Sequence, residues 1–386
     1  MVGMRDVARK AGVSLSTVSL VVNGTGYVSD AMRTRVEAAM RELDYIPNEL
    51  ARNLFRGRTG TIGVIVPTIR HPFFASLAAA LQRAFAAQGR RTLLCSTADA
   101  DAGEAEYVDM LRRHMMDGIV MAAHTEHTPD YWTSIGRPVV AFDRMLGEGI
   151  PTVGSDHEQG GRLAAERLLA GGARHVVTVG GPRSQFDAAV GDPGAAGAAG
   201  TFPTVRYHLT VERLFAQAGG RWDYVDAGAV SALADHAAAA RAVFDRFPDA
   251  DAIVGSDLVA ACCVQEAWAR GIRVPEDVQI VAYDGTYVAD VAGVPLTAVV
   301  QDLDAIADRI AARMDAAIGG GDGAAGGAGA ADGAADGVAG DISGTGSAVG
   351  EGPAGGAEGA GSACAAPDVG APDIVPVRFL PRASTR

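Results

Sequence analysis

Residues 5–19, RDVARKAGVSLSTVS, decide the fold of the first part of the chain. Gly12 can adopt the left-handed backbone of a tight corner, and Ser14 or Ser16 can cap a helix that follows it. Apolar residues share one face on each side of this corner: Val7, Ala8 and Ala11 before it, and Val18 with Val21 or Val22 after it. The stretch therefore predicts a helix-turn-helix, whose second helix enters the major groove of DNA. From spacing alone, an ordinary helical hairpin fits equally well.

Charge is distributed unevenly along the chain of 386 residues, whose formal net charge is −13. Residues 1–60 carry nine Arg and Lys against six acidic residues, so the rest of the chain is strongly acidic. A basic head on an acidic body is typical of a DNA-binding module joined to another domain. Because the basic excess is small, we expect two heads to act together on DNA.

Cysteine usage and hydropathy indicate a metal-free chain that works in the cytoplasm, and no motif calls for a cofactor. The four cysteines show no metal-ligand spacing and read as buried free thiols: Cys95, Cys262, Cys263 and Cys364. The chain shows no secretory signal pattern and no apolar run of membrane-spanning length.

Strand and helix patterns alternate after Thr61, which predicts parallel sheets covered by helices on both faces. The expected strands are 62–66, 92–95, 118–122, 139–142, 176–179, 252–254, 278–282 and 298–300. The expected helices are 74–88, 102–114, 159–170, 205–218, 232–247, 259–269 and 303–317. So long a pattern suits two lobes better than one open sheet, with ligands bound at the carboxyl ends of the strands.

One segment departs from this pattern. Residues 319–372 hold 35 Gly and Ala, seven acidic residues and no Lys or Arg, so we expect a disordered insertion before the strand-like run 374–380. The expected domains are a headpiece at 1–46, a hinge helix and linker at 47–60, a two-lobed core at 61–318 with 373–386, and the insertion at 319–372.

Several separate motifs resemble the LacI/GalR family of bacterial transcriptional regulators. The headpiece motifs are DVA at 6–8, AGVS at 11–14, TVS at 17–19, VNG at 22–24 and YVS at 27–29. The later motifs are YIPN at 45–48 with Ala51, Arg52 and Leu54, RTGTIGVIVP at 58–67, Gly271, VPED at 274–277 and YD at 283–284. The resemblance covers nearly the whole chain apart from 319–372 and the region around 188–204.

The resemblance implies a helix-turn-helix headpiece on a two-lobed core like that of periplasmic binding proteins. It further implies a dimer, or a dimer of dimers, that binds a pseudo-palindromic operator and acts as a repressor under the control of a small ligand. The DNA-binding residues that it implies are Leu15, Ser16, Thr17, Ser19, Leu20, Asn23, Tyr27, Asn48, Ala51 and Leu54.

Two leucines of this set have alternative roles. In the family, a leucine at the position of Leu54 wedges into a base step of the minor groove, but Leu54 could instead pack on the core. Leu20 stands where the family usually has arginine, which removes a guanine contact worth ~1–3 kcal/mol of discrimination. Leu15 and Leu20 could touch thymine methyl groups, or Leu20 could serve in packing.

The effector site is expected where the two lobes meet. The candidate residues are Phe73, Asp143, Arg144, Arg206, Asp257, Asp284 and Gln301. Carboxylate, guanidinium and amide groups suit a sugar or polyol, although purine-binding relatives share the fold. Phe73 could equally be a core residue, and Asp257 could equally cap a helix.

Two other function classes fit the sequence less well than a regulator does. A sugar receptor of an uptake system would share the two-lobed fold, but it predicts a signal peptide and no headpiece. An enzyme is not expected, because the sequence holds no phosphate-binding loop, nucleophile elbow or metalloprotease motif.

Overall fold

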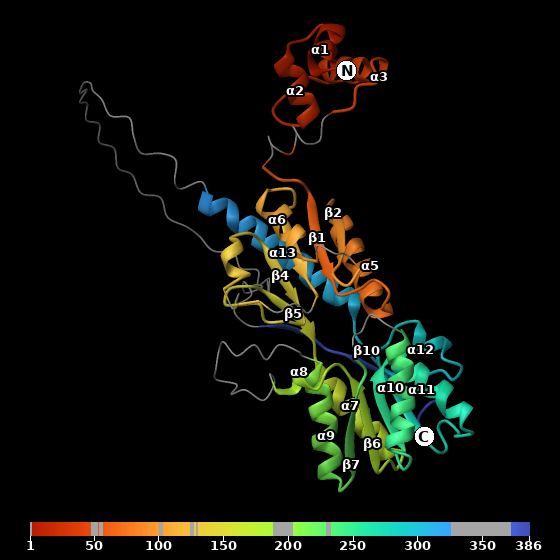
Figure 1. Cartoon of the computed structure of the whole chain (residues 1–386). Coiled ribbons are helices and arrows are strands. Elements are labelled where there is room, and N and C mark those ends of the chain that lie inside the picture. Colours follow the sequence, from red (N-terminus) through yellow and green to blue (C-terminus); the bar gives the residue numbers. More distant parts are fainter. Residues whose placement is uncertain are drawn as a thin grey trace, which may run out of the picture.

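The computed structural model shows a small helical headpiece and a two-lobed α/β core (Figure 1). It describes residues 2–47, 53, 57–99, 103–123, 127–128, 130–187, 204–228, 233–325 and 372–386. The hinge positions Asn48, Ala51 and Leu54, and most of the predicted insertion, lie outside the described residues.

The headpiece consists of α1 (Met4–Ala11), α2 (Leu15–Asn23) and α3 (Asp30–Glu42). Gly12 ends α1 with a φ of +63°, as the corner requires. Val7, Val18 and Val36, one from each helix, are fully buried in a common core. The guanidinium of Arg35 donates hydrogen bonds to the carbonyls of Ala11 and Gly12, which ties α3 to the corner.

Lobe 1 is built on a parallel sheet with the order β11-β5-β4-β3-β1-β2. Its strands are β1 (Thr61–Val66), β2 (Arg91–Ser96), β3 (Gly118–Met121), β4 (Val139–Phe142), β5 (Thr152–Ser155) and β11 (Asp373–Val375). Its helices are α5 (Pro72–Ala87), α6 (Ala105–Arg112), the short η1 (Thr133–Ile135) and α13 (Leu303–Ala325). The α5 and α13 helices cover one face, and α6 packs on the other.

Lobe 2 has the sheet order β12-β10-β9-β8-β6-β7, parallel except that β12 runs antiparallel to β10. Its strands are β6 (His175–Gly180), β7 (Arg221–Asp226), β8 (Ala252–Ser256), β9 (Gln279–Asp284), β10 (Thr297–Val300) and β12 (Arg378–Leu380). Its helices are α7 (His157–Ala170), α8 (Ser184–Asp187), α9 (Val205–Gln217), α10 (Leu233–Arg246), α11 (Asp257–Ala269) and α12 (Val288–Val291).

The prediction of two parallel α/β lobes is confirmed, and the structure corrects it in detail. The strands β5 and β7 were not predicted, because β5 is short and contains glycine while β7 is an edge strand with mixed polar residues. The last helix continues to Ala325, beyond the expected end at 317, although four of the eight added residues are glycine, which disfavours helix. The run 374–380 forms two strands, one in each sheet.

The chain passes between the lobes three times: from β5 to α7, from β10 to α13, and from β11 to β12. These crossovers are bonded to one another. The backbone N–H of Asp156 donates to the carbonyl of Val375 at 2.9 Å, and that of Val377 donates to Gln159 Oε1 at 2.8 Å. The hydroxyl of Ser155 lies 2.7 Å from Gln301 Oε1. The carboxyl ends of the strands of both lobes therefore meet at one junction.

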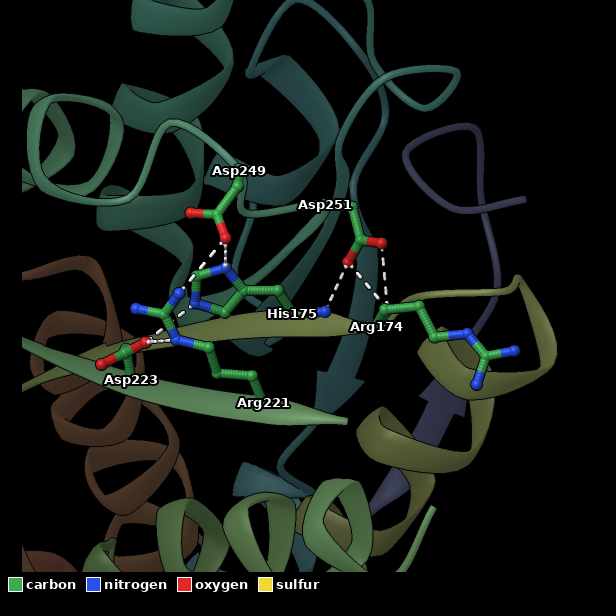
Figure 2. Close-up of polar contacts among 6 residues, drawn as sticks. All are labelled: Arg174, His175, Arg221, Asp223, Asp249 and Asp251. Carbon is green, nitrogen blue, oxygen red and sulfur yellow. Dashed lines mark hydrogen bonds and ion pairs between the residues drawn. The ribbon is translucent and has the colours of Figure 1, made fainter. Parts of the chain in front are cut away.

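A second polar cluster lies at the opposite end of the lobe 2 sheet, where β6 begins (Figure 2). His175 Nε2 is 2.9 Å from Asp223 Oδ2, and Arg221 pairs with the carboxylates of Asp223 and Asp249. Asp251 accepts hydrogen bonds from the backbone N–H groups of Arg174 and His175. We interpret this cluster as structural, because it fixes the amino ends of the strands, away from the junction of the lobes.

Candidate DNA-binding surface and effector site

The start of α2 is organised by Ser14, whose hydroxyl accepts a hydrogen bond from the backbone N–H of Thr17 at 3.1 Å. The same oxygen lies 2.7 Å from Ser16 Oγ and 2.8 Å from Thr17 Oγ1. Ser14 is thus the helix cap, one of the two residues that the sequence offered for this role. The cap leaves the first turn of α2 exposed, as a helix that enters a groove of DNA requires.

Exposure divides the headpiece residues that were predicted to bind DNA. Leu15 is 43% exposed, Ser16 is exposed, and Tyr27 is 92% exposed beyond the end of α2. The side chains of Leu15, Ser16 and Tyr27 are therefore accessible to a partner. Thr17 and Ser19 are partly buried on the same helix.

Leu20 and Asn23 contact the headpiece core, which leaves less of each side chain accessible to DNA bases. Leu20 is partly buried, packs against the core cluster and lies beside Gly26, which favours the packing role for this leucine. Asn23 is buried, and its amide donates a hydrogen bond to Ser19 Oγ at 3.2 Å.

Asp143 and Asp284 end one strand in each lobe and share an unusual backbone. Asp143 follows β4 with a φ of +50°, and Asp284 ends β9 with a φ of +133°. Positive φ at a residue other than glycine costs energy and concentrates at functional sites. These two acidic residues on strained backbone therefore support the prediction of a site at the junction.

His157 connects the lobes through both ring nitrogens. Its Nε2 lies 2.8 Å from Asp143 Oδ2, and its Nδ1 lies 2.8 Å from the hydroxyl of Tyr283. Because an ionised carboxylate can only accept, we assign the ring proton to Nε2, which leaves Nδ1 to accept from Tyr283. Neither His157 nor Tyr283 was predicted as a site residue, since their meeting depends on how α7 and β9 pack together.

Two glycines make this arrangement possible. A Cβ atom at Gly154 would lie 2.2 Å from Asp143 Oδ1, and one at Gly160 would lie 2.5 Å from the Tyr283 hydroxyl oxygen. Real Cβ atoms do not approach other atoms so closely, so any larger residue would displace these groups.

Gln301, which directly follows β10, forms a hydrogen bond to Asp284 at the end of β9. Its amide Nε2 donates to Asp284 Oδ1 at 2.8 Å, while its Oε1 faces the hydroxyl of Ser155. Burial raises the pKa of Asp284 well above its usual range, the negative charge of Asp257 raises it further, and the bond from Gln301 opposes the rise. The junction thus combines carboxyl and amide groups from both lobes.

Asp257 has a structural contact as well. It begins α11, is buried, and accepts hydrogen bonds from the backbone N–H of Gly285 and from the hydroxyl of Thr286. Burial raises its pKa to about 6, against the lowering effect of those hydrogen bonds. These contacts fix the turn that follows Asp284, which is a structural role other than capping α11, because the N-cap of that helix is Ser256.

The remaining effector candidates are Phe73, Arg144 and Arg206. The first two are buried, and the third is exposed. Phe73 is buried beside Phe142, with ring centroids 5.9 Å apart. Arg144 is buried, and its Nη1 donates to the carbonyl of Ala123 at 3.1 Å. Arg206 is exposed in the first turn of α9.

Two rings of α9 add an aromatic wall that the sequence did not predict. Tyr207 stacks on Tyr283 with centroids 4.1 Å apart, and His208 lies 3.8 Å from the Tyr207 ring. Burial and the charge of His157 lower the pKa of His208 to about 3, so this imidazole is neutral at physiological pH. In the described residues, no group of three or more His, Cys, Asp or Glu side chains is arranged to hold a metal ion.

A helix-turn-helix headpiece on a two-lobed core with a polar junction defines a ligand-responsive DNA-binding regulator. The family models agree: residues 3–48 match the bacterial regulatory proteins of the lacI family, residues 59–200 match the periplasmic binding proteins and sugar binding domain of the LacI family, and residues 165–327 match a periplasmic binding protein-like domain. The chain belongs to the LacI family of bacterial regulatory proteins. It is a DNA-binding transcriptional regulator and not an enzyme.

Curated relatives extend the similarity over most of the chain. The ribose operon repressor of Halalkalibacterium halodurans is 33% identical over 80% of this chain and 89% of its own length. The sucrose operon repressor of Streptococcus mutans is 31% identical over 79% of this chain and 89% of its own length.

Solved structures agree on the fold. A transcriptional regulator CelR–cellobiose complex is 25% identical, with a TM-score of 0.59 and full coverage of both chains. The lac repressor dimer bound to operator is 20% identical, with a TM-score of 0.71, and covers 100% of this chain and 99% of that chain. Among the described residues, no helix has the length and apolar character to cross a membrane.

Proposed function

We propose that the chain is a repressor that binds a pseudo-palindromic operator as a homodimer. One headpiece would occupy each half-site, with the exposed start of α2 in the major groove and Tyr27 beside it. Leu15, Ser16, Thr17 and Ser19 are the proposed contacts on α2. The modest positive charge of one headpiece supports the use of two, and an operator-binding protein works in the cytoplasm, where the bacterial chromosome lies.

We further propose that a sugar or another polyol binds at the junction of the lobes and controls the affinity for DNA. The observation that carries this proposal is the meeting of Asp143 and Asp284, two strained carboxyl groups from different lobes, around His157 and Gln301. Carboxyl and amide oxygens can accept hydrogen bonds from neighbouring hydroxyls of a polyol. The relatives named for ribose, sucrose and cellobiose support this ligand class.

The domain boundaries follow from the same proposal. Residues 1–46 would bind DNA, residues 47–60 would form the hinge, and residues 61–318 with 373–386 would hold ligand and dimerise. Strands β11 and β12, one in each sheet, support the assignment of 373–386 to the core.

A gel-shift experiment tests the function. The purified chain is mixed with palindromic DNA from its own upstream region, with and without D-ribose, sucrose or cellobiose. We expect a shifted band that at least one of these sugars weakens or strengthens. The Asp143→Asn variant should shift the same DNA but lose the response to the sugar. No shift of any such site, with or without sugar, would contradict the regulator.

A further inference from the structure

A second contact joins the lobes, and it consists of two histidines. His71, at the start of α5 in lobe 1, lies against His236 of α10 in lobe 2, with ring centroids 5.9 Å apart. The two side chains are only 6% and 3% exposed. Because no crossover of the chain passes through this contact, it can form and break as the lobes close and open.

A chain of aromatic rings links this contact to the proposed ligand site. His71 packs edge-on against Phe74 at 5.7 Å, Phe74 against Phe73 at 5.2 Å, and Phe73 lies 5.9 Å from Phe142. Phe142 directly precedes Asp143. Separation of the two histidines would therefore disturb the residues that support the strained carboxylate of lobe 1.

The surroundings of His71 suit a neutral ring and oppose a charged one. Its Nδ1 is buried and has no hydrogen-bond partner among the described residues, and Phe74 supplies an apolar wall. The neighbouring charged residue on the loop before α5, Arg70, pairs with Asp99 at 3.0 Å. On α10, the titratable group that faces His71 is His236. A proton on His71 would thus sit in an apolar site and face a second imidazole.

We propose that His71 and His236 form a proton-sensitive contact between the lobes, which holds the lobes together when both rings are neutral and releases them when His71 is protonated. The proposal deepens the proposed function, since the lobes that it controls are those that would enclose the ligand. The proton would then act as a second effector of this regulator.

The pKa of His71 gives the sign and the size of the effect. Burial, and then the charge of His236, lower this pKa from 6.5 to about 4 in the closed arrangement. The closed arrangement is therefore favoured above pH 6.5 and loses its advantage as the pH falls toward 4. Between about pH 7.5 and about pH 5, linkage predicts a fall of about 30-fold in the ratio of closed to open molecules.

Small-angle X-ray scattering of the full chain, without ligand or DNA, tests the proposal. We expect the radius of gyration of the wild type to rise between about pH 7.5 and about pH 5. The His71→Asn variant, whose side chain cannot take up a proton, should have the same radius at both values. The His71→Lys variant, which carries a permanent charge, should be expanded already at about pH 7.5.

His114→Asn is the matched control, because His114 is exposed and asparagine tolerates its φ of +58°. It should follow the wild type. His236→Asn is a second variant that should blunt the response to pH, and far-UV circular dichroism at each pH identifies any variant that has unfolded.

A wild-type radius that does not change with pH, or an equal change in wild type, His71→Asn and His236→Asn, would overturn the proposal. Because no sugar or operator is present, this result is independent of the gel-shift outcome. A chain that binds none of the sugars tested could still show the pH response. A chain that binds a sugar could equally show no pH response.

Discussion

Replacement of Tyr283 by phenylalanine isolates one hydrogen bond at the junction of the lobes. The Tyr283 hydroxyl lies 2.8 Å from His157 Nδ1, and both side chains are buried. The phenylalanine ring would keep the stacking on Tyr207 at 4.1 Å, so the packing stays the same and only the hydroxyl is lost.

The expected loss of stability follows from the His157 ring nitrogen that the substitution leaves without a donor. Without the hydroxyl, His157 Nδ1 is a buried acceptor with no partner from Tyr283, and such a group costs about 1–3 kcal/mol. We therefore expect the free energy of unfolding of the Tyr283→Phe variant to fall by about 1–3 kcal/mol. Asp143→Asn removes the ionised partner of the opposite ring nitrogen, so the two substitutions should not be additive.

Urea unfolding followed by circular dichroism measures this loss, with Tyr287→Phe as the control. Tyr287 is 64% exposed, so its hydroxyl keeps its bonds to water and the change should stay within about 0.5 kcal/mol. The reasoning is refuted if Tyr283→Phe costs no more than Tyr287→Phe, or if its effect adds fully to that of Asp143→Asn.

Three further outcomes follow from the structure. Gly160→Ala should destabilise the chain by about 1–3 kcal/mol in urea unfolding, because its Cβ would meet the Tyr283 hydroxyl at 2.5 Å. Gly319→Ala, in α13 with nothing within 4 Å, should be neutral or stabilising, and equal effects would contradict the steric argument. Asp284→Asn should gain stability relative to the wild type as the pH rises from about 5 to about 8, because the raised pKa of Asp284 makes its ionisation in the folded state unfavourable; urea midpoints that stay parallel at the two pH values would show otherwise. Operator affinity measured by gel shift should fall more than about tenfold between about 50 and about 200 mM salt, whereas a flat salt profile would speak against phosphate contacts.

Local sequence patterns were enough to predict the headpiece and most of the core. The faces that contain Val7, Val18 and Val36 could be read from helical spacing, and the apolar strands from their continuous runs. The edge strand β7 was missed because only one of its six residues is buried, so its pattern resembles that of a loop.

Only part of the site could be predicted, and that part came from the family resemblance rather than from local patterns. Asp143, Asp284 and Gln301 were chosen through the family resemblance, and the structure brings Asp284 and Gln301 into direct contact. His157 carries no local signal, and the YD motif at 283–284 did not mark Tyr283 as a site residue, because the two residues meet only when elements 126 positions apart pack together. The glycine pair at 160–161 was the one available hint, since small residues within a helix indicate a close neighbour.

The three crossovers also have a consequence for the growing chain on the ribosome. Strand β11 completes the sheet of lobe 1, yet its residues 373–375 are synthesised after every strand of lobe 2 except β12. Until they emerge, β5 is an open sheet edge, and β10 lacks its antiparallel neighbour. A nascent chain stalled before residue 372 would therefore leave β5 and β10 as exposed strand edges that the complete chain covers, which favours aggregation at this stage.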